Sequence, residues 1–266
     1  MNAFSVEREG HVALVSMLAP AMGFDFFAEL PGLFRDLDAD AGVRAIVLSG
    51  SGANFSFGLD LKDVAPMFGA LTTGAVDAEA RAGLLAQARE WQAAITAVAD
   101  SRTPVISAIQ GWCVGGGVDL VAATDIRLAS ADAKFSIRET KMAMVADLGS
   151  LQRLVGIVGD GHLRELALTG GDIDAARAEH IGLVNAVYAD AAGLRDAAIE
   201  AARAIAANSP LVTRGIKDVL DAERAPRVEA GLRYVAAWNA AFLPSRDLGE
   251  AFAAFAERRP AKFTGE

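Results

Sequence analysis

The stretch TPVISAIQGWCVGGGVDLVAATDIRLASADAKFSIRETKMAMVADLG, residues 103–149, decides the fold. It begins with an apolar run, Val105–Ile109, whose short length and sharp boundaries predict a buried strand. A turn and three consecutive glycines follow, and an apolar segment of helical character covers residues 118–123. Glycines at such a junction let the backbone approach a ligand and leave free N–H groups at a helix start. The stretch therefore predicts a strand, a turn open to a ligand and a helix in succession.

Three carboxylates in this stretch, Asp119, Glu139 and Asp147, stand in largely apolar surroundings. Acids in such settings are costly unless they are paired, hydrogen-bonded or used in chemistry. Each also has a structural interpretation. Asp119 can stabilise the positive end of a helix, Glu139 can be a surface acid in the charged run 138–141, and Asp147 can be the N-cap of a helix over 149–155. The residues alone leave these alternatives open.

A second stretch, AIVLSGSGANFSFGLDLK, residues 45–62, repeats the same order of elements. We expect a buried strand, a loop, a tight turn at Gly58 and a helix that starts near Asp60. Two loops that each present backbone N–H groups can form a two-donor oxyanion hole, which stabilises an oxygen that becomes negative during a reaction.

The pieces FSFGLDLKD at 55–63 and GWCVGGGVDLVAATDIRLAS at 111–130 resemble the crotonase (enoyl-CoA hydratase/isomerase) superfamily. Within it, the run GGGVDL…DIR…E…ADLGSLQRL most resembles the Δ3,5-Δ2,4-dienoyl-CoA isomerases. Alternating strands and helices by themselves predict only an α/β fold. The resemblance implies the ClpP/crotonase type, with a superhelical stack of ββα units over residues 1–190 and a helical oligomerisation region over 191–266.

The resemblance also implies roles for the singled-out residues. The N–H groups of Leu59 and Gly116 are expected to bind the thioester oxygen of an acyl-CoA. Moving two conjugated double bonds requires removal of a proton from C2 and addition of one at C6. We hypothesise that Glu139 does the first, that Asp147 does the second, with the reverse assignment left open, and that Asp119 tunes their pKa values.

The remaining residues of the two glycine loops are expected to bind the substrate and its coenzyme A portion. One departure from the family lies at residues 16–24, where the basic and polar residues that help to hold coenzyme A are missing. The residues expected to bind substrate are Phe55, Ser56, Gly58, Asp60, Leu61, Lys62, Gly115 and Gly117.

The composition excludes several classes of function. A net charge of −9 argues against general nucleic-acid binding and requires a local cluster of Lys and Arg if the ligand is anionic. No apolar run approaches ~20 residues, so no membrane span is expected. The single cysteine, Cys113, excludes an internal disulfide and suits the cytoplasm. The three histidines have no metal-site spacing, so no metal is expected, and the resemblance implies that no other cofactor is needed.

The predicted function is that of an acyl-CoA isomerase of fatty-acid β-oxidation, which converts 3,5-dienoyl-CoA to 2,4-dienoyl-CoA in a homotrimer or a dimer of trimers. One alternative is an enoyl-CoA hydratase in which Asp119 and Glu139 activate water for syn addition. Asp119 is one methylene shorter than the glutamate that hydratases carry there, which favours the isomerase. A second alternative is a non-catalytic binding or scaffold protein of the same fold.

Outside these motifs, the pattern predicts a hairpin over residues 3–17 and a helix over 24–38 that is interrupted near Pro31. It predicts a mobile loop over 64–74 because glycine and threonine break both periods, and a long helix over 75–100. Two helical pieces are expected over 149–169. From residue 190 onward, every predicted element is helical.

Overall fold

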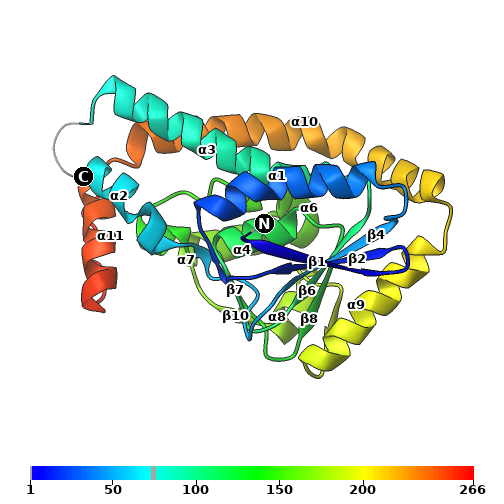
Figure 1. Ribbon diagram of the computed structural model, residues 1–266. Helices are drawn as coiled ribbons and strands as arrows, with labels where there is room; N and C mark the ends of the chain where they lie inside the picture. The colour runs from blue at the N-terminus through cyan, green and yellow to red at the C-terminus, as the bar shows by residue number, and fades with distance from the viewer. Residues whose placement is uncertain (1, 73–75) are drawn as a thin grey trace.

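The computed structural model describes residues 2–72 and 76–266. Its largest sheet has six strands (Figure 1). The first pair of strands is antiparallel, as predicted for the hairpin, and all the other pairs are parallel. In spatial order the strands are β1 (Phe4–Glu9), β2 (Val12–Met17), β4 (Ala45–Gly50), β6 (Val105–Ile109), β8 (Ile126–Ser130) and β11 (Ala186–Tyr188).

Two smaller sheets complete the strand pairing. The three-stranded sheet has the order β10 (Ile173–Asp174), β9 (Lys134–Ser136) and β7 (Trp112–Val114). The short strand β3 (Ala21–Met22) pairs in parallel with β5 (Gly58–Leu59). The second and third sheets therefore contain the backbone that surrounds both glycine loops.

Helices cover both faces of the six-stranded sheet. In chain order they are α1 (Phe24–Ala39), α2 (Leu61–Thr72), α3 (Ala78–Ala99), α4 (Gly116–Ala122), the 3₁₀ helix η1 (Glu139–Met142), α5 (Ser150–Arg153), α6 (Val155–Val158), α7 (Asp160–Thr169), α8 (Ala175–His180), α9 (Ala191–Ala206), α10 (Pro210–Phe242) and α11 (Arg246–Glu257). The mixed α/β class predicted from the sequence is confirmed.

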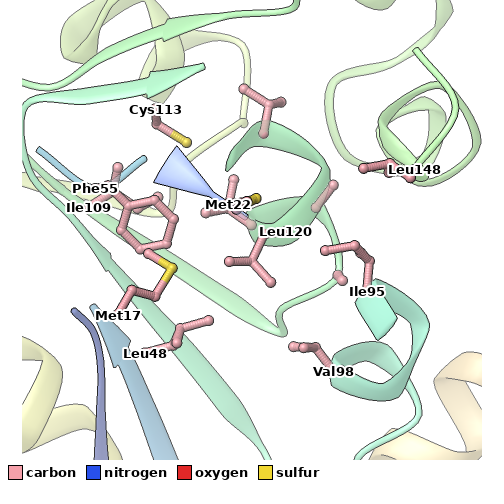
Figure 2. Close-up of a cluster of buried hydrophobic side chains, with 14 of the residues drawn as sticks. Met17, Met22, Leu48, Phe55, Ile95, Val98, Ile109, Cys113, Leu120 and Leu148 are labelled. Carbon is pink, nitrogen blue, oxygen red and sulfur yellow. The ribbon is translucent and has the colours of Figure 1, made fainter. Parts of the chain in front are cut away.

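The central strands bury side chains on both faces because neighbouring residues of a strand point in opposite directions. On β4, Val47 faces α9 in a small apolar cluster, whereas Ile46 and Leu48 face the main core. Figure 2 shows that main core, in which Leu48 of β4, Phe55 of the loop before β5 and Leu120 of α4 come together.

The backbone joins the two glycine loops directly. Phe55 N–H donates to the carbonyl of Gln110 (2.8 Å), and Ser56 exchanges hydrogen bonds with Trp112 and Val114 (2.9 Å each). Gly111, between these partners, has a φ of +57°, and a Cβ added there would lie 2.2 Å from the carbonyl oxygen of Ala53. Two segments far apart in sequence are thus held at a fixed distance beside the site.

Three predictions about helices were wrong. The segment predicted as a mobile loop forms α2 up to Thr72, and residues 73 and 74 lie outside the described part of the chain. Val64, Phe68 and Leu71 of α2 are buried, and Phe68 packs on Phe252 of α11 (5.4 Å between ring centroids), so tertiary burial outweighs the helix-breaking residues.

The helix predicted to be interrupted near Pro31 is continuous, because Phe27, Leu30 and Phe34 form a buried stripe on both sides of the proline. The segment 149–169 forms three helices rather than two, α5, α6 and α7. The helix predicted over 75–100 is present as α3, and residue 75 lies outside the described part.

The C-terminal helices occupy three positions. Helix α9 packs on the six-stranded sheet, α10 lies along α3, as Figure 1 shows at the top of the molecule, and α11 contacts α2 and η1. A domain division after residue 190 stays a prediction. Among residues 2–72 and 76–266, no helix combines the length and the apolar character that crossing a bilayer requires.

We predict that Gly111→Ala destabilises the protein far more than Gly10→Ala does. Both glycines have φ near +57°, but a Cβ at Gly10 meets nothing within 4 Å, whereas one at Gly111 meets the Ala53 carbonyl. The Gly10 variant should lose about 1–2 kcal/mol for its backbone conformation alone, and the Gly111 variant about 1–3 kcal/mol more. Urea unfolding measures both losses, and equal losses would contradict this packing of the two loops.

Candidate active site

A cleft of about 970 Å³ opens beside the two glycine loops. Its walls come from β5, the start of α2, the turn into α4, η1, α11 and the chain segment 259–263. The predicted site residues that line it are Gly58, Leu59, Asp60, Leu61, Lys62, Gly115, Gly116 and Glu139.

The two predicted oxyanion donors lie on backbone segments that touch. Gly116 is the first residue of α4, so its N–H has no acceptor within the helix. Gly58 and Gly115 both adopt positive φ (+80° and +54°), and a Cβ on Gly58 would lie only 3.0 Å from the Gly116 nitrogen. Because Leu59 follows Gly58 directly, the amides of Leu59 and Gly116 belong to adjoining turns at the same wall of the cleft.

Asp119 is buried in the first turn of α4, with 1% of its surface exposed. Its Oδ1 accepts a 2.5 Å hydrogen bond from the backbone N–H of Ser150, at the start of α5. Burial raises the pKa of Asp119 to about 6, although this hydrogen bond and the nearby guanidinium of Arg153 act in the opposite direction. Asp119 therefore stabilises two helix starts, that of α4 and that of α5.

Glu139 reaches the cleft from η1. Its Oε1 lies 3.3 Å from the position that a Cβ on Gly115 would occupy, so this carboxyl faces the turn of the oxyanion loop. Its Oε2 is buried and has no hydrogen-bond partner among the described residues. Burial, then the charge of Asp119 and that of Asp147, raise the pKa of Glu139 to about 8. The interpretation of Glu139 as a surface acid is wrong.

Asp147 is held from two helices. Its Oδ2 accepts a 2.8 Å hydrogen bond from Asn239 of α10, and its main-chain carbonyl accepts one of 2.7 Å from Gln92 of α3. Burial raises the pKa of Asp147 to about 7, and the charge of Asp119 adds to this rise. The N-cap residue of α5 is Gly149, without a side-chain cap, so the interpretation of Asp147 as a helix cap is wrong.

The three acids influence one another, but only Glu139 belongs to the lining of the cleft. Asp119 and Asp147 lie next to the lining, close enough for their charges to act on Glu139. Because like charges in a poorly solvated region oppose one another, ionisation of one acid makes ionisation of a neighbouring one less favourable. At neutral pH such a set holds both a carboxylate that can accept a proton and a carboxylic acid that can donate one.

Cationic side chains gather at the cleft despite the negative net charge of the chain. Lys62, Arg138, Lys141 and Arg259 all belong to its lining. Arg138 also lies over the Trp112 ring, 5.6 Å from its centroid. Four cations therefore line the cleft, of which Arg138 is paired with Asp172, and Arg259 with Glu250 and Glu257.

The atypical segment 16–24 adds an apolar wall to the site. Ala21 of β3 lines the cleft, and a Cβ on Gly116 would lie 3.2 Å from the sulfur of Met22. Met22, which Figure 2 places beside Leu120 of α4, is buried with 1% of its surface exposed. The segment thus packs behind Gly116, a predicted oxyanion donor, with apolar rather than polar side chains.

Three residues that we expected to bind substrate do not line the cleft. Phe55 has no exposed surface and lies in the main core, as Figure 2 shows. Ser56 is buried, and its Oγ accepts the Gly58 N–H at 3.1 Å. Gly117 packs on the Cβ of Ser56, where a Cβ of its own would come within 2.9 Å. These residues pack beneath the two loops and do not belong to the wall of the cleft.

A family model described as enoyl-CoA hydratase/isomerase matches residues 7–266. The chain belongs to this family. It is 43% identical to a mitochondrial Delta(3,5)-Delta(2,4)-dienoyl-CoA isomerase of Dictyostelium discoideum, over 90% of this chain and 81% of that protein. It is also 43% identical to a peroxisomal Delta(3,5)-Delta(2,4)-dienoyl-CoA isomerase of Arabidopsis thaliana, over 91% of this chain and 87% of that protein.

The crystal structure of an enoyl-CoA hydratase/isomerase from Mycobacterium paratuberculosis is similar over 95% of this chain and 98% of that one, with a TM-score of 0.82 and 26% identity. The predicted crotonase fold is thereby confirmed, and the chain is an enzyme of the hydratase/isomerase family.

Sequence reasoning missed the residues that support the acids in this family member. Gln92 and Asn239 are buried amides on helices whose neighbouring residues are mostly apolar, and both hold the segment around Asp147. Arg153, 3% exposed, donates to the Leu148 carbonyl and to the hydroxyl of Thr96. A polar residue inside an apolar helical stripe is the one signal in the sequence that singles out Gln92.

The raised pKa values predict how stability depends on pH. The pKa of Glu139 is about 8 in the folded protein and near 4.5 in an unfolded chain, so the folded state binds its proton more tightly. The stabilisation is complete below about pH 4.5 and is lost as the pH rises to about 8, by up to about 1.4 kcal/mol per pH unit. Glu139→Gln, which stays neutral, should flatten this decline in urea unfolding.

The matched control is Glu200→Gln on α9, where the side chain is exposed to water. This variant should keep the wild-type decline. If Glu139→Gln declines as steeply as the wild type, the carboxyl of Glu139 does not hold a proton at neutral pH.

Proposed function

We propose that this enzyme is a Δ3,5-Δ2,4-dienoyl-CoA isomerase, which converts a 3,5-dienoyl-CoA to the 2,4-dienoyl-CoA. The observation that carries the proposal is the coupling of Glu139 to a second protonatable acid, Asp147, beside two backbone N–H donors. The identity to relatives named as such isomerases supports it.

The cleft suits an acyl-CoA thioester. Its cationic residues can bind the phosphates of coenzyme A, and Met142, Met144, Ala251 and Ala254 offer an apolar surface to an acyl chain. Thioether side chains adapt to irregular ligands, which suits a chain of several double bonds.

The thioester oxygen would accept hydrogen bonds from the N–H groups of Leu59 and Gly116. These donors favour the dienolate that forms once the C2 proton has left, and one such donor is typically worth ~3 kcal/mol. Since C2 is bonded to the thioester carbon, the group that removes its proton must lie next to the oxyanion loops. Glu139 fits this position because its Oε1 faces Gly115.

Asp147 would deliver the proton to C6. Carbons C2 and C6 are ~5 Å apart, whereas a proton donor must lie within ~3 Å of its target, so one carboxyl does not serve both. The reaction removes one proton and adds one, and therefore consumes no oxidant, metal or cofactor. Asp119, tied to Ser150, would stay in place and adjust the proton affinities of the other two acids.

The pKa values of the ligand-free protein follow the opposite order, with about 8 for Glu139 and about 7 for Asp147. Moving the proton from Glu139 to Asp147 against this difference costs only about 1.4 kcal/mol. Such a cost is small beside a catalytic barrier, so position relative to the oxyanion donors outweighs it. We therefore propose Glu139 as the base at C2 and Asp147 as the acid at C6.

Enoyl-CoA hydration is the second candidate, favoured by the coupling of Asp119 to Glu139. A hydratase needs both acids to orient one water molecule. Here Oδ1 of Asp119 is occupied by the Ser150 N–H. This hydrogen bond favours the isomerase.

We further propose a homotrimer or a dimer of trimers, assembled through the C-terminal helices over 191–266. Exposed apolar side chains on α10 support this assembly, because such a face is costly in water. The cytoplasmic location stays a prediction. The large exposed residues of α10 are Leu211, Val212, Ile216, Val219, Leu220, Tyr234, Trp238 and Phe242.

We predict that the purified protein converts 3,5-dienoyl-CoA to a 2,4-dienoyl-CoA chromophore far faster than it hydrates 2-enoyl-CoA. Parallel spectrophotometric assays on the two substrates measure this ratio. Faster loss of the enoyl absorbance by water addition would favour the hydratase, and turnover of neither substrate would leave a non-catalytic binding protein as the better account.

Asp147→Asn separates the two proton transfers. It should lower isomerisation by roughly 10²–10⁴-fold, the usual worth of a general acid, while Glu139 still exchanges the C2 hydrogen with deuterated solvent. Glu139→Gln should abolish that exchange. Absence of exchange in Asp147→Asn would contradict the proposed order of transfer.

A further inference from the structure

Asn239 makes a contact that the proposed mechanism does not yet use. It lies on α10 with 4% of its surface exposed. Its Nδ2 donates to the main-chain carbonyl of Val145 (2.9 Å) and to Oδ2 of Asp147 (2.8 Å). One amide group therefore holds both the backbone before Asp147 and the carboxyl of Asp147.

The chemistry of these partners fixes the orientation of the amide. A backbone carbonyl only accepts hydrogen bonds, so the atom of Asn239 that faces the Val145 oxygen must be the NH₂ group. A flipped amide would place two acceptor oxygens against each other. The same NH₂ group faces Asp147, and Oδ2 of Asp147 is consequently an acceptor.

A fixed acceptor at Oδ2 decides where Asp147 carries its proton. In a protonated carboxyl group the carbonyl-type oxygen accepts hydrogen bonds well and the hydroxyl oxygen accepts them poorly. The oxygen that receives the Asn239 hydrogen is therefore the carbonyl-type one, and the hydroxyl is at Oδ1. Without this bond the two oxygens would exchange roles freely.

The other groups near Asp147 do not replace this function. The titratable ones are Asp119 of α4 and Glu139 of η1. The charge of Asp119 opposes the ionisation of Asp147, and the charge of Asp147 raises the pKa of Glu139. From α3 comes the uncharged amide of Gln92, which donates to the carbonyls of Asp147 and Leu232 and so fixes only backbone. The cation of Arg153 on α5 donates to the neighbouring Leu148 carbonyl.

We propose that Asn239 is a positioning residue that keeps Oδ2 of Asp147 as an acceptor and thereby reserves Oδ1 for the proton that reaches C6. The proposal rests on the proposed isomerase function. It makes α10, rather than the glycine loops, the element that prepares the second acid. Asn239 is outside the lining of the cleft and would act through Asp147.

Asn239→Leu tests the proposal because leucine has a similar volume and no donor. Losing a hydrogen bond that favours the ionised form should raise the pKa of Asp147 by about one to two units. The limb of the pH–kcat/KM profile that belongs to Asp147 should move upward by that amount. We expect kcat to fall tenfold or more and KM to change less than twofold.

Gln152→Leu is the matched control. Gln152 donates to the Gly231 carbonyl (3.4 Å), so this variant also removes a hydrogen bond to α10 but leaves Asp147 untouched. Its pH profile should match that of the wild type even if its stability falls. Should Asn239→Leu not fold, Asn239→Ser keeps one hydroxyl donor and should give a smaller shift in the same direction.

Movement of either limb in Asn239→Leu supports the contact with Asp147, because interacting groups share macroscopic pKa values and the limb alone does not assign the acid and the base. An unchanged profile in both Asn239 variants, or an equal shift in Gln152→Leu, would overturn the proposal. The split between kcat and KM separates positioning from general loosening of the fold.

Unfolding measurements test the hydrogen bond between Asn239 and Asp147 without any substrate. The pKa of Asp147, about 7 when folded and near 3.8 in an unfolded chain, makes stability fall with rising pH through that interval. In Asn239→Leu this decline should continue to a pH about one to two units higher. If the wild type turns over no dienoyl-CoA but this extension is seen, the isomerase function fails and the Asn239 contact stands.

Discussion

Three carboxyl groups share one poorly solvated region. The surrounding structure holds them there and disfavours the state in which all three are ionised. Burial alone opposes the ionisation of each acid, and each ionised neighbour opposes it further. Glu139 feels this most, since one of its oxygens is buried without a partner. The arrangement is tolerable because protons remain bound at neutral pH, and those protons are what a double-bond isomerisation has to move.

Each acid is held by a different part of the fold, which gives the three groups different surroundings. Asp119 is fixed by the start of α5 and has the lowest of the three raised pKa values. Glu139 stands against the oxyanion loop, and Asp147 is held from α3 and α10. The long helix α10 thus has an exposed apolar face and also contributes Asn239 to the surroundings of the acids.

The sequence predicted well what local order determines. The strand, glycine turn and helix over 105–123 follow from an apolar run and from consecutive glycines, which are typical of a tight junction between a strand and a helix. It predicted less well what tertiary contacts determine. Gly69 and Thr72 obscured α2, whose buried stripe exists only because the core and α11 pack on it. The charged neighbours of Glu139 concealed its burial, and no local pattern indicates that Asn239 meets Asp147 across the fold.

The central claim is that Asp119, Glu139 and Asp147 act as one set that retains protons at neutral pH. Infrared titration of the protonated carboxyl absorption tests it most directly, with Glu139→Gln and Asp147→Asn to assign the bands. We expect absorption that persists at about pH 6, weakens as the pH passes about 7 and about 8, and disappears only above that range. If wild type and variants show the same spectrum at pH 6, with no additional protonated carboxyl in the wild type, the claim is wrong.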